Sequence, residues 1–192
     1  MSRFFEIRWH GRGGQGTVTA AKSLAEAVQG TGKYAMAFPE YGPERRGAPI
    51  RAFNKFHHEK IRVHSPVQTP QVVLIVDPTL VGNKDLVSGI TESTIFIVNT
   101  ELPALRMKEK LKLTNQKLFT VPANEISYAL FHREIPNSAM LGAFARACPH
   151  IISLDKLVEE SRTAFLEMLG AGLVEKNLEA IRRGYLEGEM CE

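Results

Sequence analysis

At 192 residues the chain is long enough for one domain with its own core, and we expect a single domain over residues 1–192. Hydrophobic residues make up 44% of it and charged residues 23%, and the formal net charge is +3. Because the basic residues are scattered, this charge predicts no nucleic-acid partner. No apolar run reaches the ~20 residues of a membrane helix, and the N-terminus lacks the apolar core of a signal peptide. We therefore expect no membrane contact and a cytoplasmic location.

The two cysteines, Cys148 and Cys191, limit the cofactors that the chain can carry. A [4Fe–4S] cluster normally takes four cysteine ligands, so this chain cannot hold one alone. The cysteine spacing is not that of a metal site, and we expect reduced thiols. Adjacent His57 and His58 would point to opposite faces of a strand and could not share a metal. No metal site and no catalytic residue are predicted.

In chain order, the first predicted elements are a strand, a glycine loop and a helix. Residues 4–9 form the apolar strand, and residues 17–29 form the helix, in which apolar side chains recur at i, i+3 and i+4. Gly30 ends this helix. Shorter strands are expected at 34–38, 50–56 and 60–64, the last two paired as a hairpin.

Two aliphatic runs, 72–76 and 95–98, predict strands buried on both faces, as in a parallel sheet covered by helices. A polar residue follows each run, Asp77 or Asn99, at the end where α/β proteins place binding groups. The remaining elements are a strand at 118–121 and helices at 125–132, 138–147, 153–168 and 174–186. The pattern predicts an α/β protein with a doubly wound, mostly parallel, Rossmann-like sheet and a helical C-terminal region.

The glycine loop has the spacing Gly11-x-Gly13-x-x-Gly16 between strand and helix. Such glycines allow a tight turn and the close approach of a phosphate, while the unpaired N–H groups of the helix start favour an anion. The candidate binding residues are therefore Gly11, Gly13, Gly14, Gln15 and Gly16. The alternative is that the glycines only allow tight turning and close packing.

An NAD- or FAD-binding loop is one function that this spacing suggests. It needs an acidic residue at the end of the second strand to hold the ribose hydroxyls, and Glu40 lies near the expected distance. However, Pro39 precedes this glutamate, and the Gly14-Gln15 pair is atypical of hydride-transfer enzymes. His10, beside the loop, could bond to a ligand, although a structural role is the commoner one for such a histidine.

Residues 41–49, YGPERRGAP, carry Glu44, Arg45 and Arg46 between glycines and prolines that restrict the backbone. Guanidinium groups bind carboxylates, phosphates and protein surfaces, and a rigid loop loses little entropy when it binds. Arg45 and Arg46 are therefore predicted to contact an anion or a partner protein. Simple solvent exposure is the other explanation.

The two motifs together, GRGGQG after the first strand and PEYGPERRGAPIRAF, resemble the gamma subunit of 2-oxoacid:ferredoxin oxidoreductases. The resemblance extends to VVLIVDPTL, STIFIVNT and NSAMLGAFAR, and so covers most of the chain. Within the family, RRGAPIRAF is closer to the pyruvate and branched-chain members than to the 2-oxoglutarate group. The resemblance implies a gamma subunit of pyruvate synthase (pyruvate:ferredoxin oxidoreductase), with 2-oxoisovalerate:ferredoxin oxidoreductase as the alternative.

The resemblance also implies a reaction that an assembly carries out. Pyruvate is decarboxylated on thiamine diphosphate with Mg²⁺, electrons pass through [4Fe–4S] clusters to ferredoxin, and coenzyme A takes the acyl group to give acetyl-CoA. This chain lacks a Gly-Asp-Gly motif with a downstream Asn for thiamine diphosphate. The cofactors are therefore expected on alpha, beta and delta-type subunits, and no activity is expected of this chain alone.

In such an assembly, the glycine loop and the Arg45–Arg46 loop would lie side by side at the carboxyl edge of the sheet. They would either dock companion subunits or place the phosphates of coenzyme A, and docking is favoured. Two other classes stay open: a free-standing NAD- or FAD-binding oxidoreductase, and a non-catalytic module for an unrelated partner.

Overall fold

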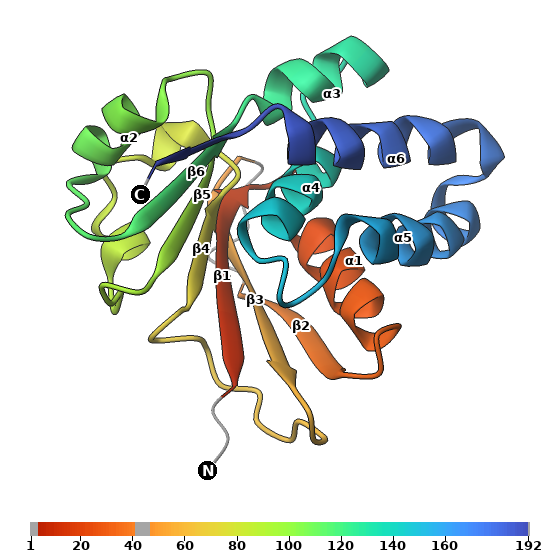
Figure 1. Cartoon of the computed structure of the whole chain (residues 1–192), viewed down its shortest axis with the longest axis horizontal. Coiled ribbons are helices and arrows are strands. Elements are labelled where there is room, and N and C mark those ends of the chain that lie inside the picture. Colours follow the sequence, from red (N-terminus) through yellow and green to blue (C-terminus); the bar gives the residue numbers. More distant parts are fainter. Residues whose placement is uncertain (1–3, 41–46, 192) are drawn as a thin grey trace.

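A seven-stranded sheet, in the order β2-β3-β1-β4-β5-β6-β7, runs through the centre of the protein (Figure 1). The computed structural model describes residues 4–40 and 47–191. The strands are β1 (Phe5–Arg12), β2 (Tyr34–Glu40), β3 (Pro49–His57), β4 (Val72–Ile75), β5 (Ile95–Asn99), β6 (Lys117–Val121) and β7 (Glu189–Cys191). The helices are α1 (Thr17–Gln29), α2 (Ala104–Leu111), α3 (Ala123–Phe131), α4 (Asn137–Ala147), α5 (Leu154–Leu169) and α6 (Ala171–Leu186).

The predicted α/β class and mostly parallel sheet are confirmed. Strands β1, β4, β5 and β6 pair in parallel, whereas β3 is antiparallel to both β1 and β2, and β7 is antiparallel to β6. The predicted hairpin strand at 60–64 is wrong, since residues 58–70 form no strand. Both edges of β3 are already paired, one to β1 and one to β2, so that segment has no free edge to join.

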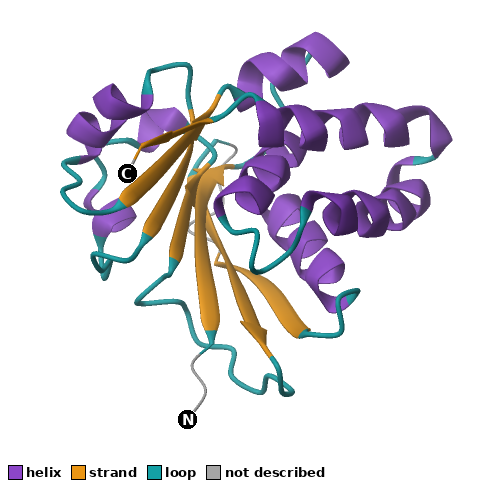
Figure 2. Ribbon diagram, in the orientation of Figure 1, coloured by secondary structure: helices purple, strands orange, loops and turns teal. Residues whose placement is uncertain are grey.

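Two apolar cores cover the two faces of the sheet, as the aliphatic runs predict. Along β4, Val72 and Leu74 enter the larger core, while Val73 and Ile75 enter the smaller one, because successive side chains point to opposite faces. Helices α1, α4, α5 and α6 cover the larger core, and α2 covers the smaller one (Figure 2). None of the helices in the described part of the chain is long and apolar enough to cross a bilayer.

The predicted helices are present, and Ser153 caps α5 by accepting a hydrogen bond from the backbone N–H of Lys156 (3.3 Å). Two elements were not predicted, α2 and β7. They support each other, because a carboxylate oxygen of Glu189 on β7 accepts a hydrogen bond from the N–H of Ala104 at the start of α2 (3.2 Å). This contact supplies the cap that Pro103, at the N-cap position, cannot.

Helices α4 and α6 approach each other at the level of their backbones. A Cβ atom on Gly184 of α6 would collide with the carbonyl oxygen of Ala139, and one on Gly142 of α4 would collide with the carbonyl oxygen of Ile181. Neither obstacle is a flexible side chain, so neither can move aside without a shift of a whole helix. The two glycine contacts fix the distance between α4 and α6.

We expect Gly184→Ala to lower the free energy of unfolding by about 1–3 kcal/mol, because the added methyl group must separate two packed helices. Urea denaturation followed by circular dichroism measures this. Gly172→Ala is the matched control, since a Cβ there meets no atom within 4 Å and alanine is the better helix former. Equal stability of the two variants would contradict the close contact.

Candidate functional site

The glycine loop lies at the carboxyl end of β1, which extends through Gly11 and Arg12, further than predicted. The chain turns at Gly14 (φ 97°) and enters α1 through Gly16 (φ 75°), both in the region that favours glycine. A Cβ on Gly11 would collide with the Thr17 hydroxyl, and one on Gly16 would lie 2.8 Å from the side-chain nitrogen of Asn137. Turning and close packing thus account for these glycines.

The polar side chains of the loop bond to one another and to the next parallel strand. Gln15 accepts a hydrogen bond from the Arg12 N–H (2.8 Å) and donates one to the Asp77 carboxylate (2.9 Å). Arg12 also forms an ion pair with Asp77 (3.0 Å) and bonds to the Thr79 hydroxyl. Asp77, whose side chain is almost fully buried, thereby ties the end of β1 to the end of β4.

The two polar strand ends that the sequence singled out have different partners. Asp77 joins the glycine loop, as described. Asn99, at the end of β5, donates to the carbonyl of Val76 (2.9 Å) and to the side chain of Asn124 (2.8 Å), and it accepts from the Asn124 N–H (3.1 Å). Asn99 therefore holds neighbouring segments in place and is not directed to a ligand.

The described end of the 41–49 loop contacts the glycine loop. The Gly13 N–H donates to the Ala48 carbonyl (3.3 Å), and the Arg12 guanidinium donates to the Gly47 carbonyl (3.0 Å). Residues 47 and 48 thus lie against the turn at the carboxyl edge of the sheet. Arg45 and Arg46, like Glu44, lie outside the described residues.

The N-terminus of α1 carries the partial positive charge of a helix, and no described side chain caps it. Its N-cap, Gly16, offers no side-chain acceptor, and the first turn carries no acidic residue. The buried hydroxyl of Thr17 has no hydrogen-bond partner among the residues that the structure describes. Because the first N–H groups of a helix are unpaired, negative charge is favoured near this end.

Glu40 does not reach the glycine loop. It is the last residue of β2, which extends two residues further than predicted, but β3 lies between β2 and β1, and two strand spacings amount to about 10 Å. Its carboxylate pairs with Arg51, directly opposite on β3 (2.8 Å). The contact to ribose that an NAD- or FAD-binding loop needs is therefore not formed by this residue.

His10 is a buried structural residue with 3% of its surface exposed. Its Nε2 accepts a hydrogen bond from Nε of Arg8 (3.0 Å), and Arg8 donates further to the carbonyls of Leu86 and Ser88. Burial, followed by the nearby charges of Arg8 and Arg51, lowers the pKa of His10 to about 3. The ring stays neutral at physiological pH.

Iron–sulfur ligation does not fit this chain. The thiol of Cys148 is buried, which raises its pKa to about 12, and Cys191 lies on β7. A thiolate is the ligating species, so Cys148 is a poor ligand. Within residues 4–40 and 47–191, no three or more His, Cys, Asp or Glu side chains gather in a way that could hold a metal ion.

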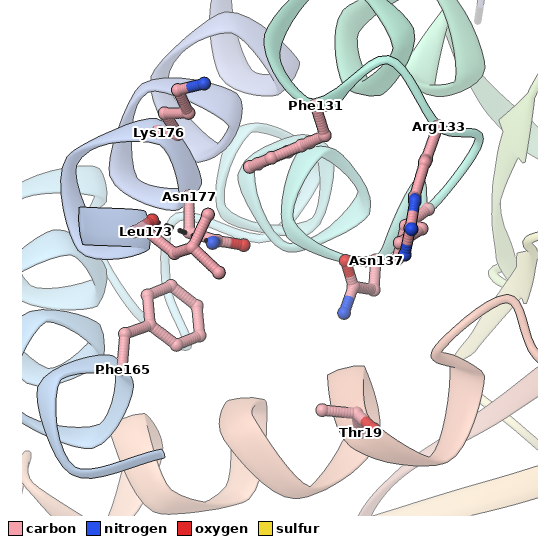
Figure 3. A pocket seen from close by; sticks show the side chains of 9 residues that line it. Thr19, Phe131, Arg133, Asn137, Phe165, Leu173, Lys176 and Asn177 are labelled. Carbon is pink, nitrogen blue, oxygen red and sulfur yellow. Dashed lines mark hydrogen bonds between the residues drawn. The ribbon is translucent and has the colours of Figure 1, made fainter. Parts of the chain in front are cut away.

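A cavity of about 560 Å³, which the sequence did not predict, lies on the helical side of the glycine loop (Figure 3). Asn137, which packs on Gly16, belongs to its wall and so connects the cavity to the loop. The other lining residues are Thr19, Phe131, Arg133, Ile135, Phe165, Leu173, Lys176 and Asn177. They come from distant parts of the chain, and no local motif marks them.

Known proteins resemble this chain over its whole length. Residues 6–187 match the family described as pyruvate ferredoxin/flavodoxin oxidoreductase. The pyruvate synthase subunit PorC of Thermotoga maritima is 42% identical over 99% of this chain and 97% of its own. The pyruvate/ketoisovalerate oxidoreductases common subunit gamma of Pyrococcus furiosus is 41% identical over 97% of this chain and 98% of its own.

The fold agrees with these relatives. The crystal structure of the pyruvate oxidoreductase subunit PORC from Thermotoga maritima superposes with a TM-score of 0.85 at 38% identity, with all of both chains covered. Together with these relatives, the sheet and the glycine turn define the class of protein: the α/β gamma-type subunits of 2-oxoacid oxidoreductases. The chain belongs to the pyruvate ferredoxin/flavodoxin oxidoreductase family.

We expect Asp77→Ala to lower the free energy of unfolding by about 1–3 kcal/mol, because Arg12 and Gln15 lose a shared, buried acceptor. Glu109→Ala, which breaks an exposed pair with Arg106, is the control and should cost less than about 1 kcal/mol. Chemical denaturation of both variants measures the difference. Equal losses would show that the Asp77 network adds nothing to stability.

The buried His10 should make stability depend on pH. Its pKa is about 3 in the folded protein and about 6.5 when exposed, so the unfolded chain binds the extra proton between these values. Stability contributed by the neutral ring is therefore complete above pH 6.5 and is lost as the pH falls toward 3. Between pH 6.5 and pH 5 the loss is roughly 2 kcal/mol.

His10→Gln tests this, because glutamine keeps an acceptor for Arg8 but does not titrate. Free energies of unfolding at pH 7 and pH 5 should fall less in the variant than in the wild type. Parallel losses in the two proteins would contradict the assignment of a neutral, buried His10.

Proposed function

We propose that this chain is the gamma subunit of a pyruvate synthase, which oxidatively decarboxylates pyruvate with coenzyme A and reduces ferredoxin. The observation that carries this is the full-length match to pyruvate synthase subunit PorC, in sequence and in fold. The name of the Pyrococcus furiosus relative covers both pyruvate and ketoisovalerate oxidoreductases. A 2-oxoisovalerate:ferredoxin oxidoreductase is therefore the second candidate.

In the proposed complex, residues 1–192 form one gamma-type domain that carries no redox cofactor. Thiamine diphosphate, Mg²⁺ and [4Fe–4S] clusters belong to the alpha, beta and delta-type subunits, and the assembly works in the cytoplasm. The two cysteines, one of them buried, support this division, since they cannot supply four thiolate ligands.

The glycine loop and the 41–49 loop then form a docking surface for companion subunits. The side chains of Arg12 and Gln15 support this role, because they are committed to internal bonds and leave Gly13 and Gly14 as exposed backbone. Placement of the coenzyme A phosphates is the competing role. The uncapped start of α1 supports it, because that end of the helix favours anions.

The double variant Arg45→Ala, Arg46→Ala in the complete complex separates these roles. If the loops dock companion subunits, purification of a tagged companion subunit should recover less of the variant complex than of the wild-type complex, because interface arginines are lost. The KM for coenzyme A of the complex that does form should stay unchanged. Intact assembly with a roughly tenfold higher KM for coenzyme A would favour phosphate binding.

Arg106→Ala with Lys110→Ala is the matched control, since it removes two exposed cations from α2 on the other face of the sheet. The gamma-subunit assignment itself fails if no thiamine- or cluster-containing subunits co-purify with the native chain. It also fails if the isolated chain binds NAD(H) or FAD tightly and stoichiometrically.

A further inference from the structure

The cavity beside the glycine loop has a polar end, with Arg133 and Asn137, and a mainly apolar end, with Phe165 and Leu173, where Asn177 also lies (Figure 3). The Arg133 side chain and the Asn137 amide are both drawn on one side of the cavity, above Thr19. Phe165 and Leu173 face them from the other side. A volume of about 560 Å³ is within the range of pockets that hold small organic ligands.

The donors at the polar end have no partner in the described residues. The Arg133 guanidinium forms no hydrogen bond or ion pair there, and neither does the side-chain nitrogen of Asn137. The oxygen of Asn137 accepts from the Ser138 N–H (2.8 Å), and the side-chain nitrogen keeps its N–H donors for a ligand. A guanidinium and an amide N–H that line the same cavity suit a carboxylate.

The electrostatic surroundings also favour a negative charge. Of the described lining residues, none is acidic, whereas Arg133 and Lys176 are cationic. The Lys176 ammonium points away from the centre in Figure 3, so its charge acts from the rim. Thr19 lies in the first turn of α1, the uncapped positive end of that helix.

The apolar end is held in place by the fold. Phe165 belongs to the main core, with 3% of its surface exposed. Asn177 fixes α6 against α4, because its side chain accepts from the Ser138 hydroxyl (2.7 Å) and donates to the Leu173 carbonyl (2.9 Å). The wall is therefore formed before any ligand binds, which reduces the entropy lost on binding.

We propose that this cavity binds a small carboxylate with an apolar body. The carboxylate accepts hydrogen bonds from Arg133 and Asn137, and the apolar body packs on Phe165 and Leu173. Such binding is a property of this chain alone and does not depend on the proposed function. A failure of one therefore leaves the other standing.

Phenylacetate and its neutral counterpart phenylethanol test the proposal on the full-length chain. In ¹H–¹⁵N NMR titrations, phenylacetate should shift amide signals of residues 131–137 and 173–177, with a dissociation constant on the order of a few millimolar. Phenylethanol should bind roughly tenfold more weakly, because it lacks the charge that Arg133 recognises.

Arg133→Ala should weaken phenylacetate about tenfold and leave phenylethanol unchanged, while Leu173→Ser should weaken both. Arg133 and Leu173 are exposed enough for these variants to fold, and circular dichroism checks this. Arg106→Ala, outside the cavity, should bind like the wild type. Equal affinities for the two compounds, shifts confined to other residues, or no effect of Arg133→Ala would overturn the proposal.

Discussion

Burial of both faces of the central strands is the constraint on which the architecture depends. The aliphatic side chains of β4 and β5 point alternately into two cores, so helices must cover both sides of the sheet. This places the carboxyl ends of β1 and β4 at one edge. Arg12, Gln15 and Asp77 meet there because the strands are parallel neighbours, and they could not do so in an antiparallel pair.

The glycine turn differs from a cofactor-binding loop in how its side chains are used. A dinucleotide-binding loop also needs an acidic side chain nearby for the ribose, whereas the acidic side chain that the structure describes at the turn, Asp77, is bonded to Arg12 and Gln15. The insertion of β3 next to β1 also moves Glu40 away from the turn.

Much of this fold could be predicted from the sequence. Helix α1 begins and ends where its periodicity predicts, and the strands β4 and β5 follow from their aliphatic runs. What could not be predicted depends on contacts between distant residues. The position of β3 between β1 and β2 depends on which strands pair with each other, and this is not encoded locally. Strand β7 has only three residues, too few for a recognisable pattern.

The same limit applies to the site. The positive φ angles of Gly14 and Gly16 and the contact of Gly11 with Thr17 are local, and the spacing of the motif indicates them. The contact of Asn137 with Gly16 joins residues far apart in the chain, as do the walls of the cavity, and no spacing in the sequence indicates either. Ion pairs such as Glu40 with Arg51 also depend on the register between neighbouring strands, which the sequence does not show.

The crossing of α4 and α6 restricts how this sequence can diverge. At Gly142 and Gly184 the obstacle to a larger residue is a peptide carbonyl, which every amino acid possesses. No second substitution on the facing helix can make room, so neither position has a compensating partner. Descendants of this chain that keep the fold should retain both glycines while the side chains around them drift.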